Sequence, residues 1–262
     1  MKKMLTETKS FKVKGISLLS VLVLLLIWTL LSTFKWVDPI FLPAPQSVWH
    51  SFISLIVEGY KGTSLTTHVF TSLYRLFASL LLALVTAIPL GIICGYSKYI
   101  LAIFDPIIEF YRPLPPLAYY ALLVLWLGID EGSKVALLFL SAFAPLFIAT
   151  VASVQRVPKD RINGALTLGA SKPNVFVHII LPSALPDIVT GLRTSIGITY
   201  ATLVAAEMVA ATSGIGWMVL DASKYMRSDI VFVGIIIMGL IAIFIDSVIR
   251  FYQRLAFSWV GK

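Results

Sequence analysis

Six long apolar stretches constrain the fold of this chain more than any other feature. They lie at about 15–34, 74–96, 115–128, 134–153, 185–212 and 229–251. About 20 apolar residues in a helix cross the roughly 30 Å hydrocarbon core of a bilayer, and a helix satisfies its own backbone hydrogen bonds there. The stretches therefore predict an all-α polytopic membrane protein with six transmembrane helices. The third stretch is short, and we expect it to gain length from its proline-rich entry.

The composition agrees with a membrane protein. Of the 262 residues, 58% are hydrophobic and 13% are charged, whereas soluble domains carry about 45–50% apolar and about 25% charged residues. The first apolar stretch is longer than the core of a cleaved signal peptide and ends in bulky residues. We therefore expect an uncleaved membrane helix after a cytoplasmic tail at 1–14. The single cysteine, Cys94, excludes an internal disulfide.

The distribution of basic residues predicts the orientation. With the amino terminus inside, fourteen of the 21 Lys and Arg residues lie on the cytoplasmic side, including Lys262, six lie on the opposite side, and Arg193 lies within the fifth span. Short cytoplasmic loops carry an excess of Lys and Arg, so we expect both termini in the cytoplasm. The net charge of +8 then reflects topology and contact with anionic lipid rather than nucleic-acid binding.

A proline-rich segment at 105–120 interrupts the transmembrane domain, which we expect to occupy 15–262. Four prolines surround Arg112 in this segment, namely Pro106, Pro113, Pro115 and Pro116. Irregular backbone near membrane depth is tolerated only where protein or a water-filled cavity covers it. The segment is therefore a packed re-entrant turn, a hinge that borders a translocation path, or both. In the second case Arg112 and Tyr119 are candidate path residues.

A polar segment between the fourth and fifth spans, within about 156–182, is the main clue to function. Its centre reads NGALTLGASKPNVFVHIILP. Pro158 suits the first turn of a helix, Gly169 can adopt the left-handed conformation that ends it, and Ser171 can cap a second helix. We expect the second helix to end before Pro182, because the residue before a proline disfavours the helical conformation. The prediction is two short helices joined by a glycine turn on the cytoplasmic side.

Helical spacing gives this segment two small apolar faces ringed by basic residues. One face holds Ile162, Ala165 and Leu166, and the other holds Val175, Ile179 and Ile180. Such a segment suits docking into a groove on a partner protein. It equally suits an amphipathic helix that lies on the lipid surface, and the residues alone leave both readings open.

The same segment resembles the EAA loop of bacterial ABC importer permeases. The family pattern is Glu-Ala-Ala, three residues, Gly, nine residues, Ile, one residue and Leu-Pro. The positions that match its later part are Gly169, Ile179, Leu181 and Pro182. The Glu-Ala-Ala places hold Asn163, Gly164 and Ala165, so only the third of them matches. The resemblance implies the type I importer (MetI-like) fold and a coupling role for these residues together with Ala170 and Ser171.

The resemblance also implies partners. The coupling helix would sit in a cleft of a cytoplasmic ATPase subunit, which binds ATP and magnesium, and an extracytoplasmic solute-binding protein would deliver the substrate. One coupling loop per chain implies a second permease copy, as a homodimer, to engage two ATPases. This sequence has no Walker motif, Gly-rich phosphate loop or catalytic carboxylate pair. We therefore expect no enzyme activity, no catalytic residue, no metal site and no cofactor in this chain.

Nearly all of the chain after residue 35 resembles the sulfonate, nitrate and taurine branch of these permeases. The stretches that carry this resemblance are FLPAPQSV, DPIIEFYRPLPPLAYYALLVLWLGIDEGSK and GLRTSIGITYATLVAAEMVAATSGIGWMV. The last two are most similar to taurine permease subunits. Ala121 departs from relatives that often carry proline, which implies a less kinked third span. The implied substrate is taurine or a related aliphatic sulfonate, with nitrate or another small anion as the alternative.

Two charged residues in the fifth span are candidates for the translocation path. Arg193 and Glu207 are 14 residues apart, which is roughly 21 Å along a helix and within about 40° of one face. They could mark two depths of one pathway. Alternatively, polar groups of a neighbouring helix could hold Glu207, and Arg193 could extend to the interface.

Two functions outside the ABC class stay open on the residues alone. One is an ion-driven secondary transporter with Glu207 as a proton or cation site, and the other is a channel-like or structural membrane protein. The polar segment favours the ABC importer, because an ion-driven carrier needs no docking segment on its cytoplasmic side.

Overall fold

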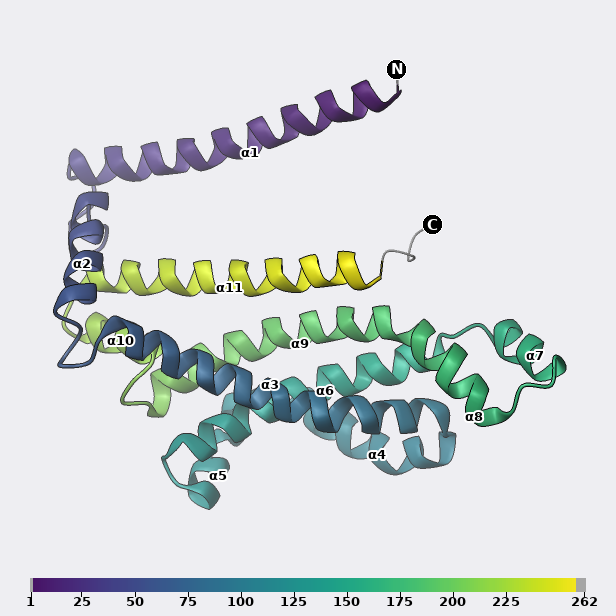
Figure 1. Ribbon diagram of the computed structural model, residues 1–262. Coiled ribbons are helices and arrows are strands. Elements are labelled where there is room, and N and C mark those ends of the chain that lie inside the picture. Colours follow the sequence, from purple (N-terminus) through teal and green to yellow (C-terminus); the bar gives the residue numbers. More distant parts are fainter. Residues whose placement is uncertain (1, 258–262) are drawn as a thin grey trace. The chain divides into compact units, whose positions relative to one another are not determined.

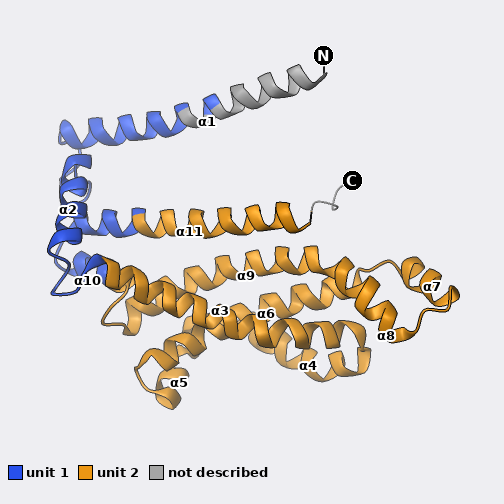
Figure 2. Cartoon of the chain, in the orientation of Figure 1, with its two compact units in different colours: residues 1–65, 218–236 blue, residues 66–217, 237–262 orange. Residues whose placement is uncertain are grey.

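The computed structural model describes the backbone of residues 2–257, and the side chains of 15, 16 and 19–257. The predicted placements of Lys262 and of the basic side chains in 1–14 fall outside this description. Two compact units make up the chain: residues 1–65 with 218–236, and residues 66–217 with 237–262 (Figure 2).

The first unit contains the amino-terminal helices and the chain that returns to them. It holds α1 (Lys2–Thr33), α2 (Pro45–Val57), most of α10 (Ile215–Lys224) and the start of α11 (Ser228–Ala256). The Trp28 indole donates to the Pro43 carbonyl over 3.0 Å and stacks on Phe232 with ring centroids 5.6 Å apart. Through Trp28, α1 therefore contacts both the chain just before α2 and the start of α11.

The second unit carries the remaining helices (Figure 1). These are α3 (Leu65–Tyr96), α4 (Lys98–Tyr111), α5 (Pro116–Leu127), α6 (Glu131–Gln155), α7 (Lys159–Thr167), α8 (Lys172–Val175), the π-helical turn η1 (Phe176–Ile180), α9 (Leu181–Ala210) and the rest of α11. Its core lies between α3, α6 and α9, around Leu76, Leu138, Leu146 and Phe147.

Small residues let the helices of this core approach closely. A Cβ atom at Gly191 of α9 would lie 2.3 Å from the Cβ of Ala149 on α6. A Cβ atom at Gly91 of α3 would lie 2.8 Å from the Cβ of Thr150. Close backbone approach through glycine and alanine is typical of packing between transmembrane helices. The helices α3 and α9 therefore pack so closely on α6 that larger side chains at these glycines would overlap it.

The prediction of an all-α polytopic membrane fold is confirmed. In the described part of the chain, the helices long and apolar enough to cross a bilayer are 65–96, 131–155, 172–210 and 228–256. Residues 19–33 and 116–127 form shorter apolar helices. Each of the six predicted spans coincides with one of these helices. The cytoplasmic location of the termini stays a prediction.

The proline-rich segment differs from the expected irregular stretch in one respect. Pro106 lies inside α4, which runs from Lys98 to Tyr111, so the break between helices is confined to 112–115. Pro115 precedes α5, and Pro116 occupies its first turn, where a missing backbone donor costs nothing. The prolines therefore separate two helices and place Arg112 at the end of the first.

Candidate coupling segment and membrane charge sites

The polar segment folds as two short helices joined at a glycine. α7 ends at Thr167, and Gly169 adopts a φ of 87°. The Gly169 amide donates to the Leu166 carbonyl and the Ala170 amide donates to the Ala165 carbonyl, each over 3.0 Å. This pair of bonds is the Schellman motif that ends helices at a left-handed residue. The prediction of a left-handed Gly169 at the end of the first helix is confirmed.

One local prediction about the second helix is confirmed in part, and another is wrong. Ser171 occupies the N-cap position of α8 in an extended conformation, but its side chain makes no capping hydrogen bond. The helix also does not end before Pro182, since α8 continues through η1 into α9. The Leu181 amide donates to the Phe176 carbonyl five residues back. This π turn widens the helix just before Pro182, so the proline is accommodated at the start of α9 without ending the chain's helical path.

The two apolar faces of the segment pack on the chain itself. Val175 and Ile180 are 3% and 4% exposed, and they lie in one cluster with Val154 of α6 and Ile188 of α9. The partly buried residues packed against this cluster include Ile162, Ala165, Ala170 and Ile179. Most residues of the two faces thus anchor the segment to α6 and α9, whereas Leu166 stays 40% exposed. The docking and lipid-surface readings both stay predictions.

The opposite edge of the segment is exposed. It includes Asn163, Gly164, Gly169 and Ser171, and Leu168 is 89% exposed at the tip of the turn. The structure thus brings the sequence-predicted coupling residues together in and beside one helix–turn–helix segment, α7 to α8 (residues 159–175), which we call the bracket. Asn163, Gly164 and Ala165 lie on α7, Gly169, Ala170 and Ser171 form the turn, and Ile179, Leu181 and Pro182 lie where η1 meets α9.

Glu207 of α9 is held by a buried arginine that sequence reasoning missed. Arg75 of α3 contacts Glu207 through Nη1 at 2.7 Å, and both side chains are 1% exposed. The same guanidinium contacts Glu131 at the start of α6 through Nε at 2.6 Å and Nη2 at 2.7 Å. The charge distribution alone places Arg75 among the six basic residues on the side opposite the cytoplasm. The signal available was that an Arg and a Glu, each within a predicted apolar stretch, both require partners.

The Glu207 carboxylate has further donors. Ser72 donates to Oε1 over 2.7 Å and the Gly216 amide donates to Oε2 over 2.8 Å. At Gly214, which has a φ of 121°, an added Cβ would lie 2.4 Å from this carboxylate. Glu207 is therefore surrounded by hydrogen-bond donors and by backbone that leaves no free space beside it.

Arg193 lies in a separate charge cluster between α9 and α11. Its Nε contacts Asp246, which also pairs with Arg250 one turn later on α11. A cavity of about 270 Å³ beside the cluster is lined by Arg193, Gly197, Tyr200 and Asp246, among others. The structure thus does not bring Arg193 and Glu207 together.

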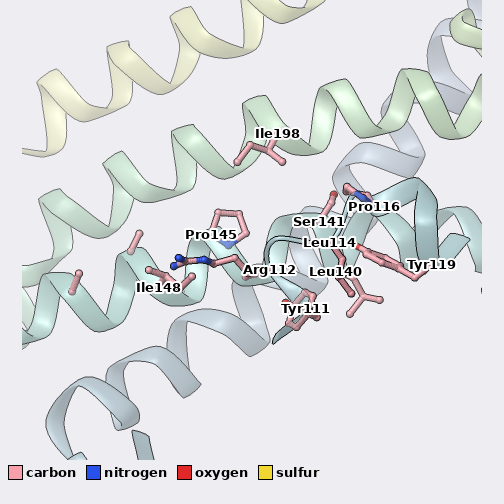
Figure 3. A pocket seen from close by; sticks show the side chains of 13 residues that line it. Tyr111, Arg112, Leu114, Pro116, Tyr119, Leu140, Ser141, Pro145, Ile148 and Ile198 are labelled. Carbon is pink, nitrogen blue, oxygen red and sulfur yellow. The ribbon is translucent and has the colours of Figure 1, made fainter. Parts of the chain in front are cut away.

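Arg112 and Tyr119 do share a cavity. It has a volume of about 460 Å³ and lies between the α4–α5 break, α6 and α9 (Figure 3). Arg112 pairs with Glu109 at 3.1 Å, and both side chains are about half exposed. In Figure 3 the Arg112 side chain extends along the α6 residues Pro145 and Ile148. Of the predicted path residues, only these two line one common cavity.

Comparison with known proteins defines the class of this helical membrane chain. The model of the family "binding-protein-dependent transport system inner membrane component" matches residues 87–257. The chain belongs to this family. It is a multi-pass plasma-membrane permease subunit of an ABC importer, it is not an enzyme, and its partners include an ATPase and a binding protein.

Individual relatives narrow the comparison. The chain is 42% identical to the taurine transport system permease protein of Escherichia coli K12 over 92% of this chain and 88% of the relative. It is 34% identical to a putative aliphatic sulfonates transport permease protein of Bacillus subtilis 168, over 90% and 84% of the two chains. It is 32% identical to a nitrate import permease protein of Synechocystis PCC 6803, over 90% and 86%.

Proposed function

We propose that this chain carries taurine or a related aliphatic sulfonate across the cytoplasmic membrane. The proposal includes a homodimer with both termini in the cytoplasm, two ATPase subunits and an extracytoplasmic binding protein. The identity to a taurine permease over most of both chains supports the substrate. Nitrate or another small anion is the alternative, because relatives with those named substrates also match.

The observation that carries the mechanism is the anchoring of the α7–α8 bracket. The bracket packs on α6 and α9 through one apolar cluster, and it continues into α9 without a break in the helix. A force applied to the exposed edge at Leu168 therefore reaches two transmembrane helices directly. Movement of an ATPase cleft that holds this edge shifts the permease between two states, provided that the contacts differ between them.

The remaining step is the passage of a permanent anion. A sulfonate cannot enter hydrocarbon without polar partners, so a polar route must open between the spans. ATP and magnesium act in the partner ATPase, and this chain contributes the route and its gating. An ion-driven carrier with Glu207 as a proton site is disfavoured by the several donors that already hold that carboxylate.

Uptake energetics test the proposal. The importer is reconstituted in vesicles with its ATPase and binding protein, and radiolabelled taurine uptake is measured. We expect uptake to stop when ATP is depleted and to continue under an uncoupler when ATP is maintained. Uptake that follows the proton gradient and ignores ATP would instead favour the ion-driven carrier. Nitrate and ethanesulfonate as competitors identify the preferred anion.

A further inference from the structure

The cavity at Arg112 combines a cation, hydroxyl groups and an apolar wall. Tyr111, Arg112 and Tyr119 come from the α4–α5 region, Pro145 and Ile148 come from α6, and Ile198 comes from α9. Its volume of about 460 Å³ falls in the range of about 300–1,000 Å³ that is typical of small-ligand sites. This mixture suits a small anion with a short apolar chain.

The Tyr111 hydroxyl is a free donor at this cavity. It is buried and has no hydrogen-bond partner among the described residues, although most buried polar groups in proteins are paired. The Ser141 hydroxyl, by contrast, already donates to the Leu138 carbonyl over 2.8 Å. An anion held at Arg112 would supply the acceptor that Tyr111 lacks once the Tyr111 side chain turns its inaccessible hydroxyl toward the cavity.

The existing partner of Arg112 is easily displaced. Glu109 and Arg112 pair within one helical turn, and their side chains are 51% and 48% exposed. Ion pairs between such exposed groups are weak, whereas a guanidinium binds tetrahedral oxyanions through several parallel hydrogen bonds. A sulfonate in the cavity can therefore replace Glu109 at Arg112.

Among the described residues that line this cavity, none is acidic. We propose that the cavity is a transit site that recognises the sulfonate headgroup and does not recognise the ammonium group of taurine. The inference rests on the proposed function and deepens it. It assigns selection between taurine and unsubstituted alkanesulfonates to the binding protein rather than to this chain.

A thiol-labelling experiment on the full importer complex tests the charge preference. In a Cys94→Ala background, Ile198→Cys places one thiol at the cavity. It reacts with two methanethiosulfonates, one with an ethylsulfonate tail and one with an ethyltrimethylammonium tail, each normalised to its rate with free cysteine. We expect the anionic reagent to be favoured by about tenfold or more, as fields in charged clefts concentrate counter-ions. Arg112→Gln should abolish this preference, Arg112→Lys should retain it, and Tyr111→Phe should reduce it.

Protection by substrates tests the headgroup claim. Ethanesulfonate and taurine should slow the labelling of Ile198→Cys equally, and Glu109→Gln should not weaken taurine relative to ethanesulfonate. The inference is overturned if labelling fails with both reagents, or if the anionic preference is absent or survives Arg112→Gln. Protection by taurine alone also overturns it, because the ammonium group would then be recognised.

Uptake by the same complexes separates this inference from the proposed function. Sulfonate uptake without anionic preference at Ile198→Cys overturns the transit site and leaves the proposed function intact. Anionic preference without sulfonate uptake supports an anion site in the cavity and contradicts the proposed substrate.

Discussion

At the scale of single residues, the buried guanidinium of Arg75 pairs with two acidic side chains of the membrane domain. It is shared by the carboxylates of Glu131 and Glu207, so one cation joins α3, α6 and α9. Burying either charge alone would be costly, and the pairing with full hydrogen bonding offsets that cost. The cluster also fixes the backbone at Ser213, whose carbonyl accepts from Arg75 over 2.8 Å.

Removing Arg75 should destabilise the protein strongly. Arg75→Met leaves a buried carboxylate without its counter-charge, and breaking such a pair costs roughly 3–5 kcal/mol. Reversible unfolding of the purified permease in detergent measures the change. The matched control is Arg156→Met, which removes an exposed pair with Asp187 and should cost about 1 kcal/mol or less. Equal effects of the two substitutions would contradict the assigned role of Arg75.

The Gly169 turn gives a second prediction at this scale. A β-branched side chain disfavours positive φ, so Gly169→Val should reshape the end of α7 and reduce uptake by at least several-fold. Gly239→Val is the control, because Gly239 lies in α11 with no atom within 4 Å of an added Cβ and without a positive φ. Uptake per inserted permease, quantified by immunoblot, is the measurement. Full uptake by a well-inserted Gly169→Val variant would count against coupling through this turn.

At the scale of helices, the second half of α10 and the chain after α2 are joined by polar contacts. Asp221 accepts from Tyr60 over 2.8 Å and pairs with Lys61 at 2.7 Å. The hydrogen bond from Lys61 lowers the pKa of the Asp221 carboxyl, and desolvation opposes that shift. In the same pair, the hydrogen bond to Asp221 raises the pKa of Lys61. The contact therefore favours the charged form of both groups.

This pair predicts an acid-sensitive contribution to stability. Because the folded pKa of Asp221 is depressed, its contribution is present above the ordinary aspartate pKa of about 3.9 and is lost as the pH falls through the lower folded value. Thermal unfolding of the wild type and of Asp221→Asn should therefore differ at neutral pH and converge below about pH 4. A difference that stays constant across this range would show that protonation of Asp221 is not involved.

Comparison of the helices with the sequence shows which features periodicity can predict. Apolar length located the four helices that are long enough to cross a bilayer, because a helix in lipid needs about 20 apolar residues whatever it packs against. The left-handed Gly169 was likewise predictable, since few residues tolerate that conformation. The continuation through Pro182 was not, because it depends on a π turn that no local residue pattern specified.

At the scale of the whole molecule, the pairing of charges was the main feature that the sequence could not supply. Arg75 and Glu207 lie more than a hundred positions apart, and nothing in their spacing relates them. The same holds for Arg193 and Asp246. Residue types identified groups that need partners in a membrane, and only the packing of α3, α6, α9 and α11 specified which partners they have.

The family assignment and the bracket geometry together suggest how the molecule works. In the proposed function, an ATPase on the cytoplasmic face would hold the α7–α8 bracket, and α6 and α9 would transmit the movement. Most residues of the two apolar faces pack on α6 and α9, and we therefore expect the partner to contact the exposed turn together with Leu166. The central claim of this account is that the Leu168 turn is cytoplasmic and lies inside the ATPase contact.

Accessibility of a cysteine at Leu168 tests this claim most directly. In a Cys94→Ala background, Leu168→Cys is exposed to a membrane-impermeant thiol reagent in inside-out vesicles, with and without the ATPase subunit. The account predicts rapid labelling of the permease alone and strong protection after the ATPase assembles with it. Labelling from the extracytoplasmic side, or labelling that the ATPase does not change, would contradict it.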